Sequence, residues 1–271
     1  MAFGFACCAL GLLARAAPPR MQMREQASAL TSLNTSSLTG AIVPSSSGLK
    51  GAQTAIAMPG GALRTWSYRS PMVQRVQVEI NTGGRPLDAD IELRAGADRL
   101  PCKMRAYAED GQLNPFRAVI ETPSEPNTVA ICNLGQYFKF TANVIADNVI
   151  EATEDCVTVL KTVAGAGLRA YSLDPAVESV QVYIESDGCP LNVRIELLQG
   201  PENTQQAIEL YTEDGSSRPF FCVINTPGSG NVLRIVNTDP SASIEAAVTP
   251  RTFGPGAQPE IDAVREIIIR E

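Results

Sequence analysis

The sequence predicts an all-β protein: two tandem homologous antiparallel β-sandwich domains with an extended N-terminal arm and a short C-terminal helix. Three features support this prediction, namely an internal repeat, short runs of alternating apolar residues, and turn residues between these runs. Aligned without gaps, residues 71–144 match residues 175–248 at about 28 of 74 positions. A repeat of about 104 residues is too long for a solenoid unit and has the size of a small domain.

Each copy contains six predicted strands. In the first strand, apolar residues alternate with polar ones, as in Val76–Ile80 and its equivalent Val180–Ile184. Glu-Asp-Gly after the third strand is a hairpin signal, because glycine tolerates the positive φ of such turns. Short strands about ten residues apart indicate a sandwich of six to eight strands. Jelly-roll and immunoglobulin-like strand orders both remain open. The strands are expected at 76–80, 87–93, 104–107, 116–120, 129–133 and 140–144, and about 104 residues later.

Composition predicts the boundaries of the segments. An apolar run, then Arg15 and Arg20, with no acidic residue before Glu25, is typical of a plastid transit peptide cleaved between Ala17 and Met23. A secretory signal is the alternative. No run of 18 apolar residues occurs, so we expect no transmembrane helix. We expect a transit peptide at 1–23, an extended arm at 24–70, sandwiches at 71–148 and 175–250, a connector at 149–174 containing a strand or short helix, and a tail at 251–271.

Charge and composition exclude several classes of function. Residues 1–70 carry a net charge of about +5, residues 71–144 about −1 and residues 175–248 about −7, which favours different partners for the two domains. The chain of 271 residues contains no histidine, which excludes histidine-based catalytic triads and histidine-ligated metals. No basic patch is interleaved with aromatic residues, so we expect no nucleic-acid partner. We therefore expect no enzyme, no catalytic residue, no metal site and no cofactor.

The cysteines do not follow the repeat. Cys102, Cys132, Cys189 and Cys222 each align with a different residue type in the other copy, so a disulfide framework is not predicted. Their expected role is that of small buried apolar groups in a reducing compartment. A thioether link to a linear tetrapyrrole is the alternative.

Several shared polar and aromatic residues have two interpretations. The Asp110 and Asp214 turns could offer oxygen atoms to calcium, but too few carboxylates cluster there, so acidic turns are expected. Glu196, like Glu92 in the first copy, is expected to face solvent. Tyr107 and Tyr211 are either an aromatic platform for a ligand or core residues.

Residues 64–69 form the first candidate partner-binding segment. Tryptophan, tyrosine and arginine are over-represented at interaction hot spots, and this segment combines all three. The alternative is that Trp66 covers the edge of the first sandwich. The candidate residues are Arg64, Trp66, Tyr68 and Arg69.

The C-terminal tail forms the second candidate segment. Its apolar residues are three and four positions apart, which predicts one stripe of a helix starting near Pro259. A helix of about ten residues is marginal alone and must dock, either on its own domain or on a partner. The candidate residues are Ile261, Val264 and Ile268.

The second copy carries the motifs Pro190-Leu191-Asn192, Ile195-Glu196-Leu197, Glu213-Asp214-Gly215, Arg218-Pro219-Phe220 and Thr226-Pro227-Gly228. Through these motifs the chain resembles an algal plastid family of tandem β-sandwich repeats, similar to accessory structural and linker-associated proteins of red-algal phycobilisomes. The first copy departs from them at Ala97, Arg99 and Asn114. The resemblance covers about 150 residues and omits both tails.

The resemblance implies a non-enzymatic linker that bridges and stabilises subunits of a plastid light-harvesting complex, the phycobilisome, through its arms and its two sandwiches. The implied partners are phycobiliproteins and other linker proteins. The implied location is the plastid stroma, peripheral to the thylakoid membrane. The alternatives are a sandwich that binds carbohydrate or another small ligand, and a transient assembly factor.

Overall fold

The computed structural model describes residues 55–96, 99–123, 126–200, 203–256 and 263–267. The predicted transit peptide, residues 24–54 of the predicted arm, and the candidate residues Ile261 and Ile268 lie outside the described residues.

Each repeat folds into eight strands, and the six predicted ones are all present. The first repeat contains β1 (Ile56–Met58), β2 (Leu63–Tyr68), β3 (Arg75–Asn81), β4 (Leu87–Ala95), β5 (Arg99–Ala108), β6 (Phe116–Glu121), β7 (Asn127–Asn133) and β8 (Phe140–Ile145). The second contains β9 (Lys161–Val163), β10 (Leu168–Leu173), β11 (Val177–Glu185), β12 (Leu191–Gln199), β13 (Thr204–Thr212), β14 (Phe220–Asn225), β15 (Asn231–Asn237) and β16 (Ile244–Phe253). A short helix, α1 (Glu154–Thr158), lies in the connector, and β17 (Val264–Ile267) is the last described element.

The strand order is that of a jelly roll. In the first repeat the order is β1-β8-β3-β6 in one sheet and β5-β4-β7-β2 in the other, and the second repeat has the equivalent order. All paired neighbours are antiparallel. This order of eight strands in two sheets resolves the choice that the sequence left open. The predicted all-β sandwich fold is confirmed.

The two additional strands of each repeat lie in segments expected to be an arm and a connector. β2 and β10 share the pattern Leu-Arg-x-aromatic-Ser, at Leu63–Ser67 and Leu168–Ser172. Their separation is 105 residues, whereas that of the later strands is 104, so an ungapped alignment does not detect them.

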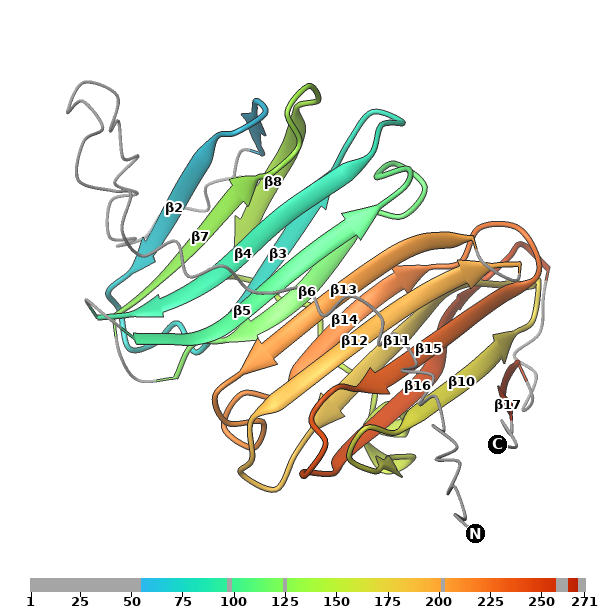
Figure 1. Ribbon diagram of the computed structural model, residues 1–271. Helices are drawn as coiled ribbons and strands as arrows, with labels where there is room; N and C mark the ends of the chain where they lie inside the picture. Colours follow the sequence, from blue (N-terminus) through green and yellow to red (C-terminus); the bar gives the residue numbers. More distant parts are fainter. Residues whose placement is uncertain (1–54, 97–98, 124–125, 201–202, 257–262, 268–271) are drawn as a thin grey trace, which may run out of the picture. The chain divides into compact units, whose positions relative to one another are not determined.

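The repeats share both sheets. β5 pairs with β13 and β6 pairs with β14, which produces one eight-stranded and one nine-stranded sheet (Figure 1). Arg105 lies opposite its own equivalent, Glu209, and Ala118 lies opposite its own equivalent, Cys222. Equivalent residues face each other only on a twofold axis, so a pseudo-twofold axis passes through both pairs.

The core lies between the two sheets and is continuous through both repeats. The inward positions of the strands alternate as the sequence predicts; Ile80, Ile91 and Phe116 have no more than a trace of exposed surface. Burial of each such side chain contributes about 1.5–3 kcal/mol.

The predicted C-terminal helix is wrong where the structure describes it, because residues Val264–Ile267 are strand β17. They pair antiparallel with β10, from Leu173 opposite Val264 to Ala170 opposite Ile267. The edge of β10 offers unpaired backbone groups, and an isolated helix of this length is marginal, so strand pairing is favoured. None of the described helices is long and apolar enough to cross a membrane.

Candidate functional site: sheet edges and faces

The predicted residues of β2 lie on an outermost strand. β2 is the last strand of the nine-stranded sheet, and within the described chain it pairs only with β7. The Trp66 side chain is 8% exposed and belongs to the core, as the alternative interpretation expected. Tyr68 is half-buried, and desolvation together with the charge of Asp147 raises its pKa to about 12. Arg64 and Arg69 are exposed, so these two present charge at this edge.

β17 occupies the corresponding edge of the second repeat. Val264 packs against the core, and the Glu266 carboxylate accepts hydrogen bonds from Arg169 and, at 2.9 Å, from Lys161 Nζ. Desolvation opposes ionisation of Glu266, but these two cations outweigh it and hold its pKa below the usual value. β17 is therefore held by backbone pairing and one clasped carboxylate.

The equivalent edges of β10 and β2 differ in what covers them. Ala170 and Ser172 of β10 lie opposite Ile267 and Arg265 of β17. Their equivalents in β2 are Thr65 and Ser67, whose backbone groups therefore point away from β7. Among the described residues, no strand pairs with that side of β2.

The connector covers the outer face of the eight-stranded sheet where the repeats meet. The equivalent glutamines Gln77 and Gln181 are both buried, and both bind the connector backbone. Gln77 Oε1 accepts a hydrogen bond from Ile150 N at 2.8 Å, and Gln181 Oε1 accepts one from Thr153 N at 3.2 Å. Apolar connector residues, Ile150 among them, pack on Val119, Phe221 and Val223. The connector thus straps the two repeats together.

The outer face of the nine-stranded sheet carries alternating charges. Across four neighbouring strands the register places Asp90, Arg105, Glu209 and Arg194 in one row. Glu196 faces outward as predicted but is only 5% exposed, because Arg194 and Arg234 clasp its carboxylate. The expectation that Glu196 is solvated is therefore wrong. Salt-bridge networks of this kind neutralise the surface and leave little net charge.

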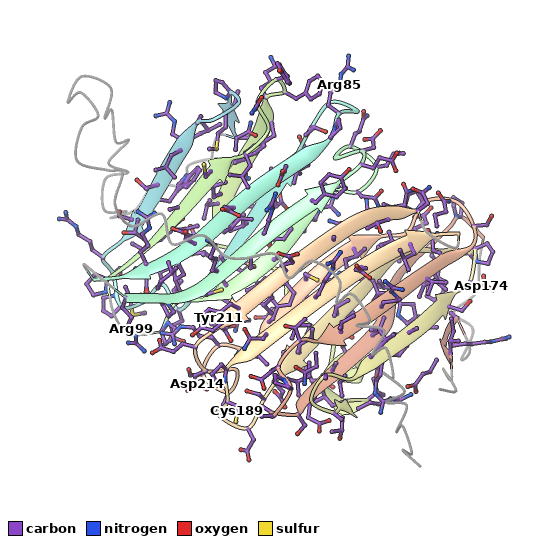
Figure 2. The ribbon with its side chains drawn as sticks, viewed as in Figure 1. Arg85, Arg99, Asp174, Cys189, Tyr211 and Asp214 are labelled. Atoms are coloured by element: carbon purple, nitrogen blue, oxygen red, sulfur yellow. The ribbon has the colours of Figure 1, made fainter. Side chains whose placement is uncertain are left out.

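Tyr107 and Tyr211 lie on this same outer face and are 40% and 39% exposed, so the alternative that they are core residues is wrong. Figure 2 places Tyr211 near the loops that carry Asp214 and Cys189. The two tyrosines are related by the pseudo-twofold axis, on the adjacent strands β5 and β13.

The acidic turns are structural. Asp110 Oδ1 accepts hydrogen bonds from the backbone N–H groups of Gln112 and Leu113, and Asp214 does the same in the second repeat. The N–H groups of Ser217 and Ser216 lower the pKa of Asp214. Within the described ranges there is no group of three potential metal-ligating side chains.

The cysteines occupy different environments. Cys102, Cys156 and Cys222 are buried, Cys132 is partly buried and Cys189 is exposed, and all five are free. Desolvation raises the pKa of Cys102 to about 12, so its thiol stays protonated and packs as an apolar group. Cys189 does not fit the predicted burial.

An open groove of about 820 Å³ lies beside the junction of the repeats. Arg117, Asn225 and Arg251 are among its lining residues, and none of the lining residues is aromatic. Arg117 Nη1 donates to Asn225 Oδ1, and Arg251 Nη1 donates to the connector backbone at Glu151. Both arginines therefore have structural roles: Arg117 binds Asn225 at the junction of the repeats, and Arg251 binds the connector.

A comparison with protein-family models matches residues 50–250 to the family described as diatom pyrenoid shell protein. The matched range contains the first repeat, the connector, and the second repeat up to residue 250 in β16. No curated protein matches the chain.

Proposed function

Because the chain belongs to the diatom pyrenoid shell protein family, we propose that it is a non-enzymatic structural protein of the plastid, a building block of a protein shell around a pyrenoid. The observation that carries this proposal is the family match over residues 50–250, which takes in both jelly rolls except the last three residues of β16. Its partners are then other copies of the chain and further components of the same assembly.

The arrangement of the strands supports a building-block role. Two sheets run through both repeats, and each ends in an outermost strand at either side: β1 and β9 in one sheet, β2 and β17 in the other. Outermost strands carry unpaired N–H and C=O groups and are templates for pairing with another chain.

Two experiments test the proposal. In a diatom host, a fluorescent fusion of the chain should form a continuous layer at the pyrenoid surface, and the purified chain should form extended assemblies visible by negative-stain electron microscopy. A diffuse stromal signal combined with a purified chain that stays monomeric at all concentrations would contradict the proposal.

The narrower prediction of a phycobilisome linker is the alternative. The family match names the pyrenoid shell and gives the linker role no support. The same fusion separates the two, because a linker would follow the phycobilisomes on the thylakoid surface. The small-ligand alternative would require the exposed pair Tyr107 and Tyr211 to bind a ligand.

A further inference from the structure

We propose that copies of this chain associate head to tail, with the open edge of β2 in one copy pairing with the open edge of β17 in the next, so that the nine-stranded sheet continues from copy to copy. The inference rests on the proposed function, because it names the contact through which the building blocks assemble.

The edges of the nine-stranded sheet are the longer ones. β2 has six residues and β17 has four, whereas the outermost strands of the eight-stranded sheet, β1 and β9, have three each. Natural proteins blunt their edges by keeping the outermost strands short. β2 is the longest edge left open among the described residues.

The second repeat shows what such an edge binds. The edge of β10, which shares the Leu-Arg-x-aromatic-Ser pattern of β2, is covered by β17 through backbone pairing. β17 thereby becomes the outermost strand in turn. Ala263 O accepts from Asp174 N, and Arg265 and Ile267 continue this pairing, so the backbone groups of Val264 and Glu266 point outward. Thr65 and Ser67 of β2 present the matching row.

The directions of the strands are compatible with translation. All neighbours in the nine-stranded sheet are antiparallel, so its first strand, β17, and its ninth, β2, run in the same direction. They lie at opposite ends of the sheet (Figure 1). A second copy related by translation therefore places its β17 parallel to β2, and parallel pairs form regular ladders.

Charge favours this pairing over a symmetric one. Residues 55–78 contain arginines and no acidic residue, and Arg64 and Arg69 are exposed. Two β2 strands paired about a twofold axis would bring the arginines of both copies to one edge, and like charges on paired strands are destabilising. β17 carries one basic and one acidic residue, Arg265 and Glu266, so a β2–β17 contact sets one arginine-bearing edge against a strand of no net charge.

The contact is heterologous, because two different surfaces meet. Heterologous contacts related by translation do not close and produce open rows of copies. A row of this kind is the element from which a sheet-like shell can be made, whereas a twofold β2–β2 contact would stop at a dimer.

The test removes one outward N–H group from each edge of the full chain. Ser67→Pro blocks the β2 edge and Val264→Pro blocks the β17 edge. Among the described residues neither N–H donates a hydrogen bond, so both variants should fold. Ser67→Ala and Val264→Ala are the matched controls, since they keep the N–H group. Circular dichroism and thermal unfolding check the fold, and sedimentation velocity measures the size of the species.

The proposal expects three results. The wild type and both alanine controls form species larger than a dimer as concentration rises. Each proline variant alone associates at least about tenfold more weakly. An equimolar mixture of the two forms a one-to-one dimer and nothing larger, because only one open edge of each kind remains.

Other results would overturn the proposal. If Val264→Pro alone forms a stable dimer, the contact is β2 with β2. If the full chain is a monomer that associates only after deletion of residues 1–54, the chain's own N-terminal segment covers the edge. If both folded proline variants assemble as the wild type does, the proposed function stands and this contact is wrong, whereas a wild type that never associates contradicts the proposed function itself.

Discussion

Asn133 and Asn237, equivalent residues at the ends of β7 and β15, each tie three backbone segments together. Asn237 Nδ2 donates to Ala164 O at 3.1 Å and to Ala242 O at 2.7 Å, and its Oδ1 accepts from Asp239 N at 3.1 Å. Asn133 makes the equivalent contacts, with Phe138 O at 3.0 Å among them. Both side chains are buried, so the hydrogen bonds cannot be replaced by water. These asparagines hold the edge strand of each repeat to the sandwich.

We predict that Asn237→Ala lowers the free energy of unfolding by about 3 kcal/mol, because buried carbonyl oxygens lose their donor. Asn81→Ala is the control; Asn81 is exposed at the end of β3 and should change stability by less than about 0.5 kcal/mol. Urea unfolding followed by circular dichroism measures both. Equal losses in the two variants would show that the asparagine ties are not specific.

At the scale of single elements, the connector binds both repeats at once. Because Gln77 and Gln181 are equivalent residues on either side of the pseudo-twofold axis, one short connector segment, which contains Ile150 and Thr153, donates hydrogen bonds to both. The sequence predicts that a short helix or strand packs between the domains, and α1 lies in this connector. The sequence could not predict that Gln77 and Gln181 bind the connector, since polar residues at outward strand positions are usually solvated.

We predict that the double substitution Gln77→Ala and Gln181→Ala loosens the connector from the outer face of the eight-stranded sheet. Each lost hydrogen bond should contribute about 1 kcal/mol, so the amides of Ile150 and Thr153 should exchange about five times faster if they open separately and about thirty times faster if they open together. Hydrogen–deuterium exchange measures this. Gln136→Ala, at an exposed position, should leave both rates unchanged, and unaltered exchange in the double variant would contradict the role of the strap.

The second element-scale prediction concerns β17. Because the folded pKa of Glu266 is lower than its unfolded value of about 4.5, its stabilising effect is present above that pH and is lost as the pH falls through the folded pKa. We expect the protection factors of the Arg265 and Ile267 amides to fall on acidification below about pH 4.5. Glu266→Gln should show low protection at pH 7 with little further change. Glu154→Gln, at an exposed residue of α1, should behave as the wild type does.

Local patterns predicted the elements whose environment is set by their own repeat. Alternation marks β3 and β11 because one face of each strand is buried against the opposite sheet. Strand β17 was not predicted, because three of its four residues are exposed and the spacing of its apolar residues therefore does not mark a buried face. The burial of Trp66 agrees with the alternative interpretation that it covers the edge of the first sandwich, whereas strand β2 itself lies in a segment expected to be an extended arm.

At the scale of the whole molecule, the joining of the repeats was beyond sequence reasoning. An ungapped repeat favours two separate domains, and nothing local distinguishes β5 or β6 from a solvent-facing edge. Their complementarity depends on contacts between distant residues: Asn114 Nδ2 donates to Asn225 O at 3.0 Å, and Asn225 Nδ2 donates to Leu113 O at 3.0 Å. On the axis, Arg105 lies opposite Glu209 in the register, so opposite charges face each other where two identical copies would place like residues.

We predict that the described fold unfolds in one transition, because both sheets and the core cross the junction. Calorimetry at a concentration at which the chain is monomeric should yield equal calorimetric and van't Hoff enthalpies. Asn114→Ala removes a fully buried junction contact and should lower the midpoint by about 2–8 °C while the transition stays single. Gln112→Ala, an exposed neighbour, is the control. Two resolved transitions in the wild type would mean that the two repeats unfold as independent domains, which would contradict this prediction.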